Sequence, residues 1–287
     1  MSEVLKATAA KGSQPFLSVK NLVVEYSTRK GPFRAVNDVS FDLQRGSTIA
    51  IVGESGCGKS TVAKSIMRLI KPTSGSIVLD GNDLLSLNES ALRPLRHKFQ
   101  MVFQDPYGSL DPRQTAEEII TEPLKIQRVH SSAERTKEAK RLLDRVGLSE
   151  NSLYRRPNEF SGGQRQRIGI ARALASKPEL LVCDEATSAL DVSVQAQVLR
   201  LLAEIQAETG ISYVFISHNL GVVQEISEHT MVMRRGELIE LGKTSQVLSA
   251  PKAEYTRALR RAALDPSIMQ GVKPRYLLSA LSSSSAK

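Results

Sequence analysis

The stretch TIAIVGESGCGKST, residues 48–61, decides the fold of this chain of 287 residues. Its first five residues form a continuous apolar run, which is typical of a strand buried on both faces of a parallel sheet. Residues 53–61 then fit the pattern GxxxxGK[ST], in which glycines let backbone amides wrap phosphate groups. The alternative is a glycine-rich structural turn, but this match begins where a strand ends and opens a helix, whose N-terminus adds positive potential. The stretch therefore predicts a phosphate-binding loop between a strand and a helix.

The side chains at the end of this loop suit a nucleotide and its metal ion. Lys59 is expected to reach the β- and γ-phosphates, and Ser60 to place its hydroxyl on Mg²⁺. The loop also contains Cys57, and the surrounding amides and the Lys59 ammonium are expected to favour its thiolate form. Alkylation of Cys57 is then expected to block nucleotide binding.

A second apolar strand ends in two acidic residues. Residues 180–183 are Leu-Leu-Val-Cys, and Asp184 and Glu185 follow them. One carboxylate can hold the water shell of a metal ion while the next orients and deprotonates an attacking water. Such a pair could also be a solvated strand end, but beside a phosphate loop it predicts a site for nucleotide hydrolysis.

A serine and two glycines open another helical segment. Its first residues are Ser161, Gly162, Gly163 and Gln164. Exposed amides at a helix N-terminus, together with a serine hydroxyl, form a potential second anion site. The plain alternative is a capping turn with Ser161 at the N-cap.

Strand and helix patterns alternate along most of the chain. Strands are expected at residues 16–26, 36–43, 48–52, 76–79, 99–103, 179–184 and 211–216. Helices are expected at residues 59–70, 115–128, 132–146, 163–176, 192–209 and 253–264. This alternation implies an α/β fold with a mostly parallel sheet, and segment 105–176, which lacks strand alternation, is expected to be an inserted helical subdomain.

Composition sets weaker limits. The chain has 39 Lys and Arg against 30 Asp and Glu, and its charge of +9 alone does not choose among nucleic acid, anionic lipid and an acidic partner. Two cysteines, Cys57 and Cys183, are too few for a disulfide framework or a four-thiolate metal site, which fits a reducing cytosol. No apolar run reaches the roughly 18 residues of a membrane span, and residues 1–15 lack the apolar core of a signal peptide.

Six motifs, in order and spacing, resemble the ATPase subunit of ABC transporters over about residues 16–250. They are the phosphate loop, Gln104 after a strand, Ser161–Gln164, Asp184–Glu185, Ser188–Asp191 and His218. Residues 102–112, 189–198 and 251–256 resemble more narrowly the oligopeptide/dipeptide importer branch, which also takes up nickel, glutathione and some opines. The resemblance implies a P-loop NTPase core with a mixed sheet, an antiparallel N-terminal β subdomain and the helical insert. It also implies an importer-type extension at 251–277. Flexible tails are expected from composition alone, at residues 1–15, which are small and polar, and at residues 278–287, which are rich in Ser and Ala.

The resemblance implies a role for each matching residue. Tyr26 would stack on adenine, although a strand-face core tyrosine is the alternative. The phosphates would be held by Gly53, Glu54, Ser55, Gly56, Cys57, Gly58, Lys59, Ser60 and Thr61. Ser60, Gln104 and Asp184 would lie near Mg²⁺, with Gln104 also touching the water. Glu185 would be the general base, and His218 would contact the γ-phosphate, although a lone histidine is more often structural.

Other family residues would act across a subunit interface. Ser161, Gly162, Gly163, Gln164 and Asp191 would complete an ATP site on a second, head-to-tail ATPase subunit, identical or paralogous. Three positions depart from the usual pattern, with Phe160 for Leu, Ala186 for Pro and Asn219 for Asp, and none removes a group that the chemistry requires. The tail PKAEYT at 251–256 replaces the usual Pro-x-His-Pro-Tyr-Thr, and the cysteine cluster of some branch members is absent, so no iron–sulfur centre is expected.

The implied function is an ATP-driven import motor for peptides or related small solutes, peripheral on the cytoplasmic face of the membrane. Its partners would be two transmembrane permease subunits and, indirectly, an extracytoplasmic solute-binding protein. The alternatives are a non-transport ABC ATPase acting on nucleic acid or ribosomes, a phosphonate-processing complex and an export motor, against which the run at 103–107 argues. No nucleic acid is expected.

The positive charge is concentrated in two segments. Residues 125–172 hold twelve Lys and Arg against five Asp and Glu, and residues 252–287 hold seven against two. We interpret this excess as a surface facing permease subunits and anionic headgroups. The alternative is a solvated helix face.

Overall fold

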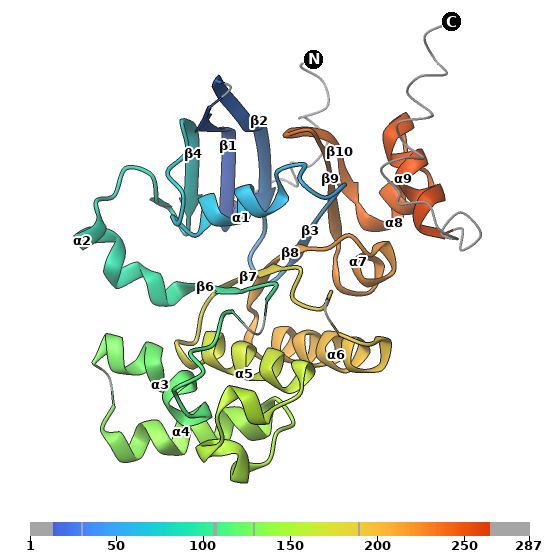
Figure 1. Ribbon diagram of the computed structural model, residues 1–287. Helices are drawn as coiled ribbons and strands as arrows, with labels where there is room; N and C mark the ends of the chain where they lie inside the picture. Colours follow the sequence, from blue (N-terminus) through green and yellow to red (C-terminus); the bar gives the residue numbers. More distant parts are fainter. Residues whose placement is uncertain (1–13, 30, 106–107, 129, 189, 265–287) are drawn as a thin grey trace, which may run out of the picture.

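The computed structural model describes residues 14–29, 31–105, 108–128, 130–188 and 190–264, and within them it has two sheets (Figure 1). The smaller sheet is antiparallel along its whole order, β2-β1-β4-β5. Its strands are β1 (Leu17–Thr28), β2 (Gly31–Leu43), β4 (Ser74–Leu79) and β5 (Asn82–Asp83). The alternating apolar residues of β1 and β2 fill one face of this sheet, as their period of two requires. The predicted antiparallel N-terminal β part is therefore confirmed.

The larger sheet is mixed, in the order β10-β9-β3-β8-β7-β6. Its strands are β3 (Thr48–Val52), β6 (Phe99–Val102), β7 (Leu180–Asp184), β8 (Ser212–Ile216), β9 (His229–Arg234) and β10 (Glu237–Lys243). Every pairing is parallel except that of β10 with β9. All residues of β3, β7 and β8 are buried, which accounts for their continuous apolar runs.

Three helices occupy the segment predicted to be helical, and Figure 1 shows them on the far side of the larger sheet from β1 and β2. They are α3 (Ala116–Gln127), α4 (Ser132–Arg145) and α5 (Gly162–Ala175), with short 3-10 turns η3 (Glu150–Tyr154) and η4 (Pro157–Glu159) between the last two. Each of the three helices begins at a capping box, at Thr115, Ser131 and Ser161 respectively. Local sequence therefore fixes where each helix starts.

The remaining helices connect and cover the strands. They are α1 (Lys59–Ile66), α2 (Glu89–Leu92), η2 (Arg93–Lys98), α6 (Val192–Thr209), α7 (Leu220–Ile226), α8 (Thr244–Ser249) and α9 (Glu254–Leu264). The helix predicted at 59–70 ends earlier, at Ile66, because Arg68 turns left-handed with φ of 53° and donates to the Leu87 carbonyl. The helix predicted at 253–264 is α9. Of the described residues, no helix is long and apolar enough to cross a membrane.

Parts of several predictions lie outside the described residues. Outside them lie residues 1–13 of the predicted tail at 1–15, the whole predicted tail at 278–287, and residues 265–277 of the predicted extension. Pro106, Tyr107 and Ala189, which carry part of the importer-branch resemblance, also lie outside them.

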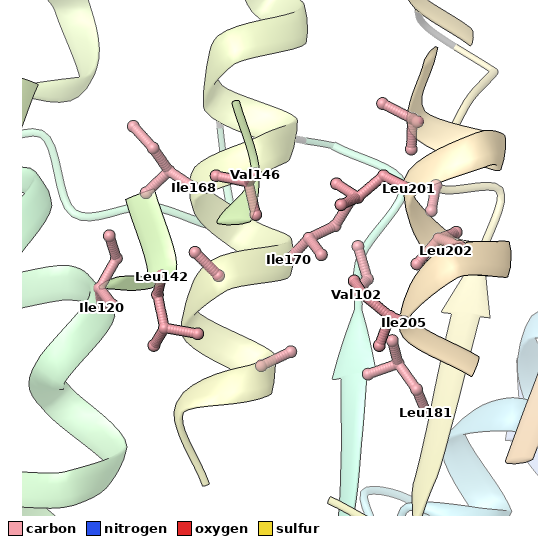
Figure 2. Close-up of a cluster of buried hydrophobic side chains, with 14 of the residues drawn as sticks. Val102, Ile120, Leu142, Val146, Ile168, Ile170, Leu181, Leu201, Leu202 and Ile205 are labelled. Atoms are coloured by element: carbon pink, nitrogen blue, oxygen red, sulfur yellow. The ribbon is translucent and has the colours of Figure 1, made fainter. Parts of the chain in front are cut away.

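One hydrophobic cluster joins the helical subdomain to the sheet. Figure 2 shows Ile168 of α5 beside Val146, and Ile170 on the opposite side of the helix facing Leu201 of α6. Two residues along a helix are about 200° apart, so α5 packs on both sides at once. Val102 of β6 and Leu181 of β7 extend the same cluster into the sheet. The helices are therefore packed against the strands through one continuous hydrophobic cluster.

Substituting Leu202 tests this junction. Leu202 of α6 is fully buried in the shared cluster, so Leu202→Ala should lower the free energy of unfolding by about 2–5 kcal/mol. The matched control Leu69→Ala removes a side chain that is 54% exposed and should change it by less than about 0.5 kcal/mol. Urea unfolding followed by circular dichroism measures both. An equal loss in the two variants would contradict the assigned packing.

Candidate nucleotide-binding site

The loop at residues 53–61 runs from β3 to α1, and two of its glycines meet neighbouring backbone. Gly53 has φ of 150°, and a Cβ there would lie 2.2 Å from the Met233 carbonyl oxygen at the end of β9. Gly58 has φ of 105°, and a Cβ there would lie 2.4 Å from the Ala35 carbonyl oxygen of β2. A side chain at Gly53 would push the loop away from the larger sheet, and one at Gly58 would push it away from the smaller sheet. The glycine spacing of the motif is thus a packing requirement as well as a signature.

Lys59 lies folded back over its own loop. Its side chain is buried, and its Nζ donates to the carbonyl oxygens of Gly53 at 2.9 Å and Glu54 at 2.8 Å. Ser55 and Gly56 form the exposed tip, while Gly53 and Cys57 are buried beneath it and Glu54, Gly58, Ser60 and Thr61 are half-buried. An ammonium held between carbonyls at the edge of a glycine loop is placed to meet an incoming phosphate.

Ser60 and Asp184 join the phosphate loop to the second acidic strand end. The Ser60 hydroxyl donates to Asp184 Oδ1 at 2.9 Å, although the residues are 124 positions apart. Asp184 is only 5% exposed, and burial raises the pKa of its carboxyl. A divalent cation would supply the positive charge that favours the ionised form there. A hydroxyl and a carboxylate are oxygen donors of the kind that Mg²⁺ takes alongside phosphates and water.

Glu185 is the point where three predicted site residues meet. Gln104 Nε2 donates to Glu185 Oε2 at 2.8 Å, and His218 Nδ1 lies 3.5 Å from the same oxygen. Gln104, Glu185 and His218 follow β6, β7 and β8, three adjacent parallel strands, so their carboxyl ends meet at one edge of the sheet. Glu185 has φ of 47°, a left-handed conformation that is costly for a residue other than glycine and is typical of functional sites.

The contact with His218 shifts both titrations. Hydrogen bonding to His218 lowers the pKa of Glu185, and the Glu185 carboxylate raises the pKa of His218. Glu185 is therefore ionised at neutral pH and able to accept a proton. The stabilisation from Glu185 is lost as pH falls below the ordinary value of 4.5, and that from His218 as pH rises above 6.5, so the contact is strongest between them.

The Ser161 segment and Asp191 take structural roles within their own helix N-termini. Ser161 Oγ accepts from the Gln164 amide at 3.3 Å, and Gln164 Oε1 accepts from the Ser161 amide at 3.0 Å. Asp191 Oδ1 accepts from the Val194 amide at 2.9 Å. A Cβ on Gly163 would lie 2.6 Å from Val194 Cγ1, so this glycine lets α5 approach α6. The capping interpretation is thus confirmed, while an additional nucleotide contact by Ser161, Gly162, Gly163, Gln164 or Asp191 stays a prediction.

Tyr26 lies apart from the acidic edge, on the smaller sheet. It is 37% exposed and pairs directly across the strands with Phe33, which is 56% exposed. Tyr26 is therefore available to a planar ligand. The alternative interpretation required a tyrosine buried in the core, and Tyr26 is not buried. Phe33 was not predicted as an exposed aromatic residue, although its place opposite Tyr26 follows once β1 and β2 are paired as a hairpin.

The expectation that Cys57 favours its thiolate form was wrong, while its part in binding phosphate stays a prediction. Its thiol is only 5% exposed, and burial raises its pKa more than the nearby Lys59 ammonium lowers it. The Sγ atom lies 4.0 Å from Lys59 Nζ, but a thiolate would lose its solvation there. Burial likewise raises the pKa of Cys183, to about 12. The neutral thiols of both residues are core-like, and rapid alkylation at neutral pH is not expected.

A glycine loop between a parallel strand and a helix, with an acidic strand end beside it, defines the class of P-loop ATPases. Within this class the chain belongs to the ABC transporter family, whose profile, described as ABC transporter, matches residues 36–188. It is an ATPase whose hydrolysis of ATP is coupled to transport.

Named relatives match over most of the chain. A probable peptide ABC transporter ATP-binding protein of Sinorhizobium fredii is 50% identical over 261 residues, covering 88% of this chain and 74% of that protein. A putative peptide import ATP-binding protein of Brucella ovis is 45% identical, covering 88% and 80%. A glutathione import ATP-binding protein of Salmonella paratyphi A is 45% identical over 93% of this chain, which spans only 44% of that longer protein.

Solved structures confirm the fold. The dimeric post-hydrolysis state of the ATP-binding cassette MJ0796, bound to ADP and Pi, has a TM-score of 0.74 and 32% identity, covering 79% of this chain and 98% of that one. The cbiO1 protein of Clostridium perfringens, part of the ABC transporter complex cbiONQ, has a TM-score of 0.72 and 25% identity, covering 93% and 100%.

The Glu185–His218 contact predicts a pKa difference. In the nucleotide-free chain, Glu185→Gln removes the carboxylate, so the pKa of His218 should fall towards its ordinary value of 6.5. An NMR titration of the imidazole signals measures this, with His218→Gln identifying the resonance among the four histidines. The control Glu204→Gln, at an exposed position on α6, should leave the titration unchanged. A His218 pKa that is the same in wild type and Glu185→Gln would show that the two side chains do not interact.

Proposed function

We propose that this chain is the ATP-hydrolysing motor of an importer for peptides or related small solutes. The observation that carries the assignment of the chemistry is the meeting of Gln104 and His218 on one oxygen of an ionised Glu185, beside the Ser60–Asp184 contact. The names of the S. fredii and B. ovis relatives, at 45–50% identity, support the importer and its solute class.

In this proposal each part of the site has one task. The loop Gly53–Thr61 binds the phosphates through its amides and Lys59, and Tyr26 stacks on the base. Ser60, Asp184 and Gln104 hold Mg²⁺, which when bound neutralises charge on the phosphates. Glu185 accepts the proton of the attacking water, and His218 fixes the direction of that carboxylate. The lowered pKa of Glu185 supports this role because a base must be ionised.

A second ATPase subunit completes the site. Ser161 and Asp191 cap α5 and α6, with Gly163 in the first turn of α5, and both helix N-termini are at least partly exposed. We propose that these termini close on ATP bound to the phosphate loop of a head-to-tail partner, and the dimeric state of the MJ0796 cassette supports such a pairing. Closure on ATP and opening after hydrolysis would then drive two permease subunits at the cytoplasmic face of the membrane.

The basic segment of the helical subdomain supplies one candidate contact with the permease or headgroups. Lys137 is exposed on α4, whereas Arg135 donates to the His130 carbonyl and Lys140 pairs with Glu150. Arg135 and Lys140 therefore already have partners within the subdomain. Lys137 is the better probe of an electrostatic contact in this part of the chain.

Glu185→Gln tests the proposed base. The variant should bind ATP and trap the closed pair while turnover falls by about 100-fold or more, because general-base catalysis of this kind contributes 10²–10⁴-fold. Phosphate release and size-exclusion chromatography with Mg²⁺ and ATP measure both effects, and Glu204→Gln is the control that should behave as wild type. Near-normal turnover in Glu185→Gln would remove Glu185 from the role of base.

A further inference from the structure

The C-terminal helix α9 packs beside the strand that leads into the phosphate loop. Tyr255, in its first turn, is 7% exposed and belongs to a cluster with Ala50 and Val52 of β3 and Val232 of β9. Figure 1 shows α9 close to α8 and β10, at the same end of the sheet. A segment more than 190 residues beyond the loop in sequence is therefore packed directly behind it.

Contacts on both sides of α9 fix its place. The Glu240 carboxylate of β10 accepts from the amides of Lys252 at 2.9 Å and Ala253 at 3.1 Å, just before the helix begins. Further along, Arg260 Nη1 donates to the Ser249 carbonyl at 3.0 Å. Leu259 packs against the same cluster as Tyr255. The helix is thus docked through polar and apolar contacts together.

The Tyr255 hydroxyl reaches the phosphate loop itself. It accepts a hydrogen bond from the Glu54 amide at 3.4 Å, and the Glu54 carbonyl in turn accepts from Lys59 Nζ at 2.8 Å. The Arg234 guanidinium lies 4.8 Å from the centre of the Tyr255 ring. Arg234 is next in sequence to Met233, whose carbonyl oxygen lies against Gly53. The phenol is therefore held between β9 and the second residue of the loop.

We propose that Tyr255 is a positioning residue for the phosphate loop, through which the docking of α9 sets the affinity for ATP. The inference rests on the proposed nucleotide site at residues 53–61. The hydrophobic side chains packed around Tyr255 are aliphatic, and the Arg234 guanidinium can lie over a phenylalanine ring as well, so a phenylalanine would fill the same space. What the hydroxyl adds is a fixed direction for the Glu54 amide. The Glu54 amide nitrogen shares a peptide plane with the Gly53 carbonyl, so this hydrogen bond also holds that carbonyl on Lys59 Nζ at 2.9 Å, and the remaining loop amides keep the shape that a phosphate meets.

Tyr255→Phe tests the proposal because it removes one oxygen and keeps the ring. In the full chain with Mg²⁺, the Kd for ATP measured by titration calorimetry should rise roughly three- to tenfold, the effect of losing one hydrogen bond. The KM for ATP should rise by a similar factor while kcat at saturating ATP and the thermal midpoint stay as in wild type. A purely structural role would move the thermal midpoint and leave the Kd unchanged.

Three further variants separate the possible outcomes. Tyr154→Phe alters a tyrosine that is 70% exposed and should change nothing, and Glu240→Ala, which frees the start of α9, should raise the Kd in the same direction as Tyr255→Phe. Lys59→Ala should abolish tight ATP binding. If Lys59→Ala loses ATP while Tyr255→Phe binds it as tightly as wild type or more tightly, the role of Tyr255 is overturned and the nucleotide site stands. If Lys59→Ala binds ATP normally, the nucleotide site itself is wrong, and the inference falls with it.

Discussion

The parallel pairing of β8 with both β3 and β7 is the constraint on which the site depends. Ile216 is the register partner of Ile51 on one side and of Asp184 on the other. The phosphate loop and the acidic pair therefore leave the sheet at the same edge, close enough for Ser60 to bond Asp184. Because side chains alternate along a strand, a slip of one residue would turn Asp184 to the other face and separate the two halves of the site.

Lys59 and Glu185, two charged side chains of the site, have hydrogen-bond partners within the chain itself. Lys59 is held by two carbonyls of its own loop, and Glu185 is held by Gln104 and His218. A buried charge without a partner costs folding free energy, so these contacts stabilise the charged side chains in their places. Each contact is also one that a phosphate, a metal ion or a water can replace, which suits a site that must bind, hydrolyse and release in every cycle.

The parts that the sequence predicted correctly have local causes. The pattern of residues 48–61 indicates a buried strand and a glycine loop within fourteen positions. The helix starts at Thr115, Ser131 and Ser161 follow from capping pairs three residues apart. The errors came from tertiary effects. Burial reversed the expected pKa shift of Cys57, and the contact between Glu54 and Tyr255 spans 201 positions, so no local pattern reveals it. Local sequence patterns also do not reveal residue roles that depend on a second subunit, because the contacts for those roles form between two chains.

The central claim is that the ends of β3 and β7 form one site for the phosphates and their metal ion. The most direct measurement is a crystal structure of the full chain bound to Mg²⁺ and a non-hydrolysable ATP analogue. We predict phosphate groups within the loop Gly53–Thr61, the metal ion on the Ser60 hydroxyl, and Asp184 beside it. Phosphates bound outside that loop, or a metal ion distant from both Ser60 and Asp184, would contradict the account.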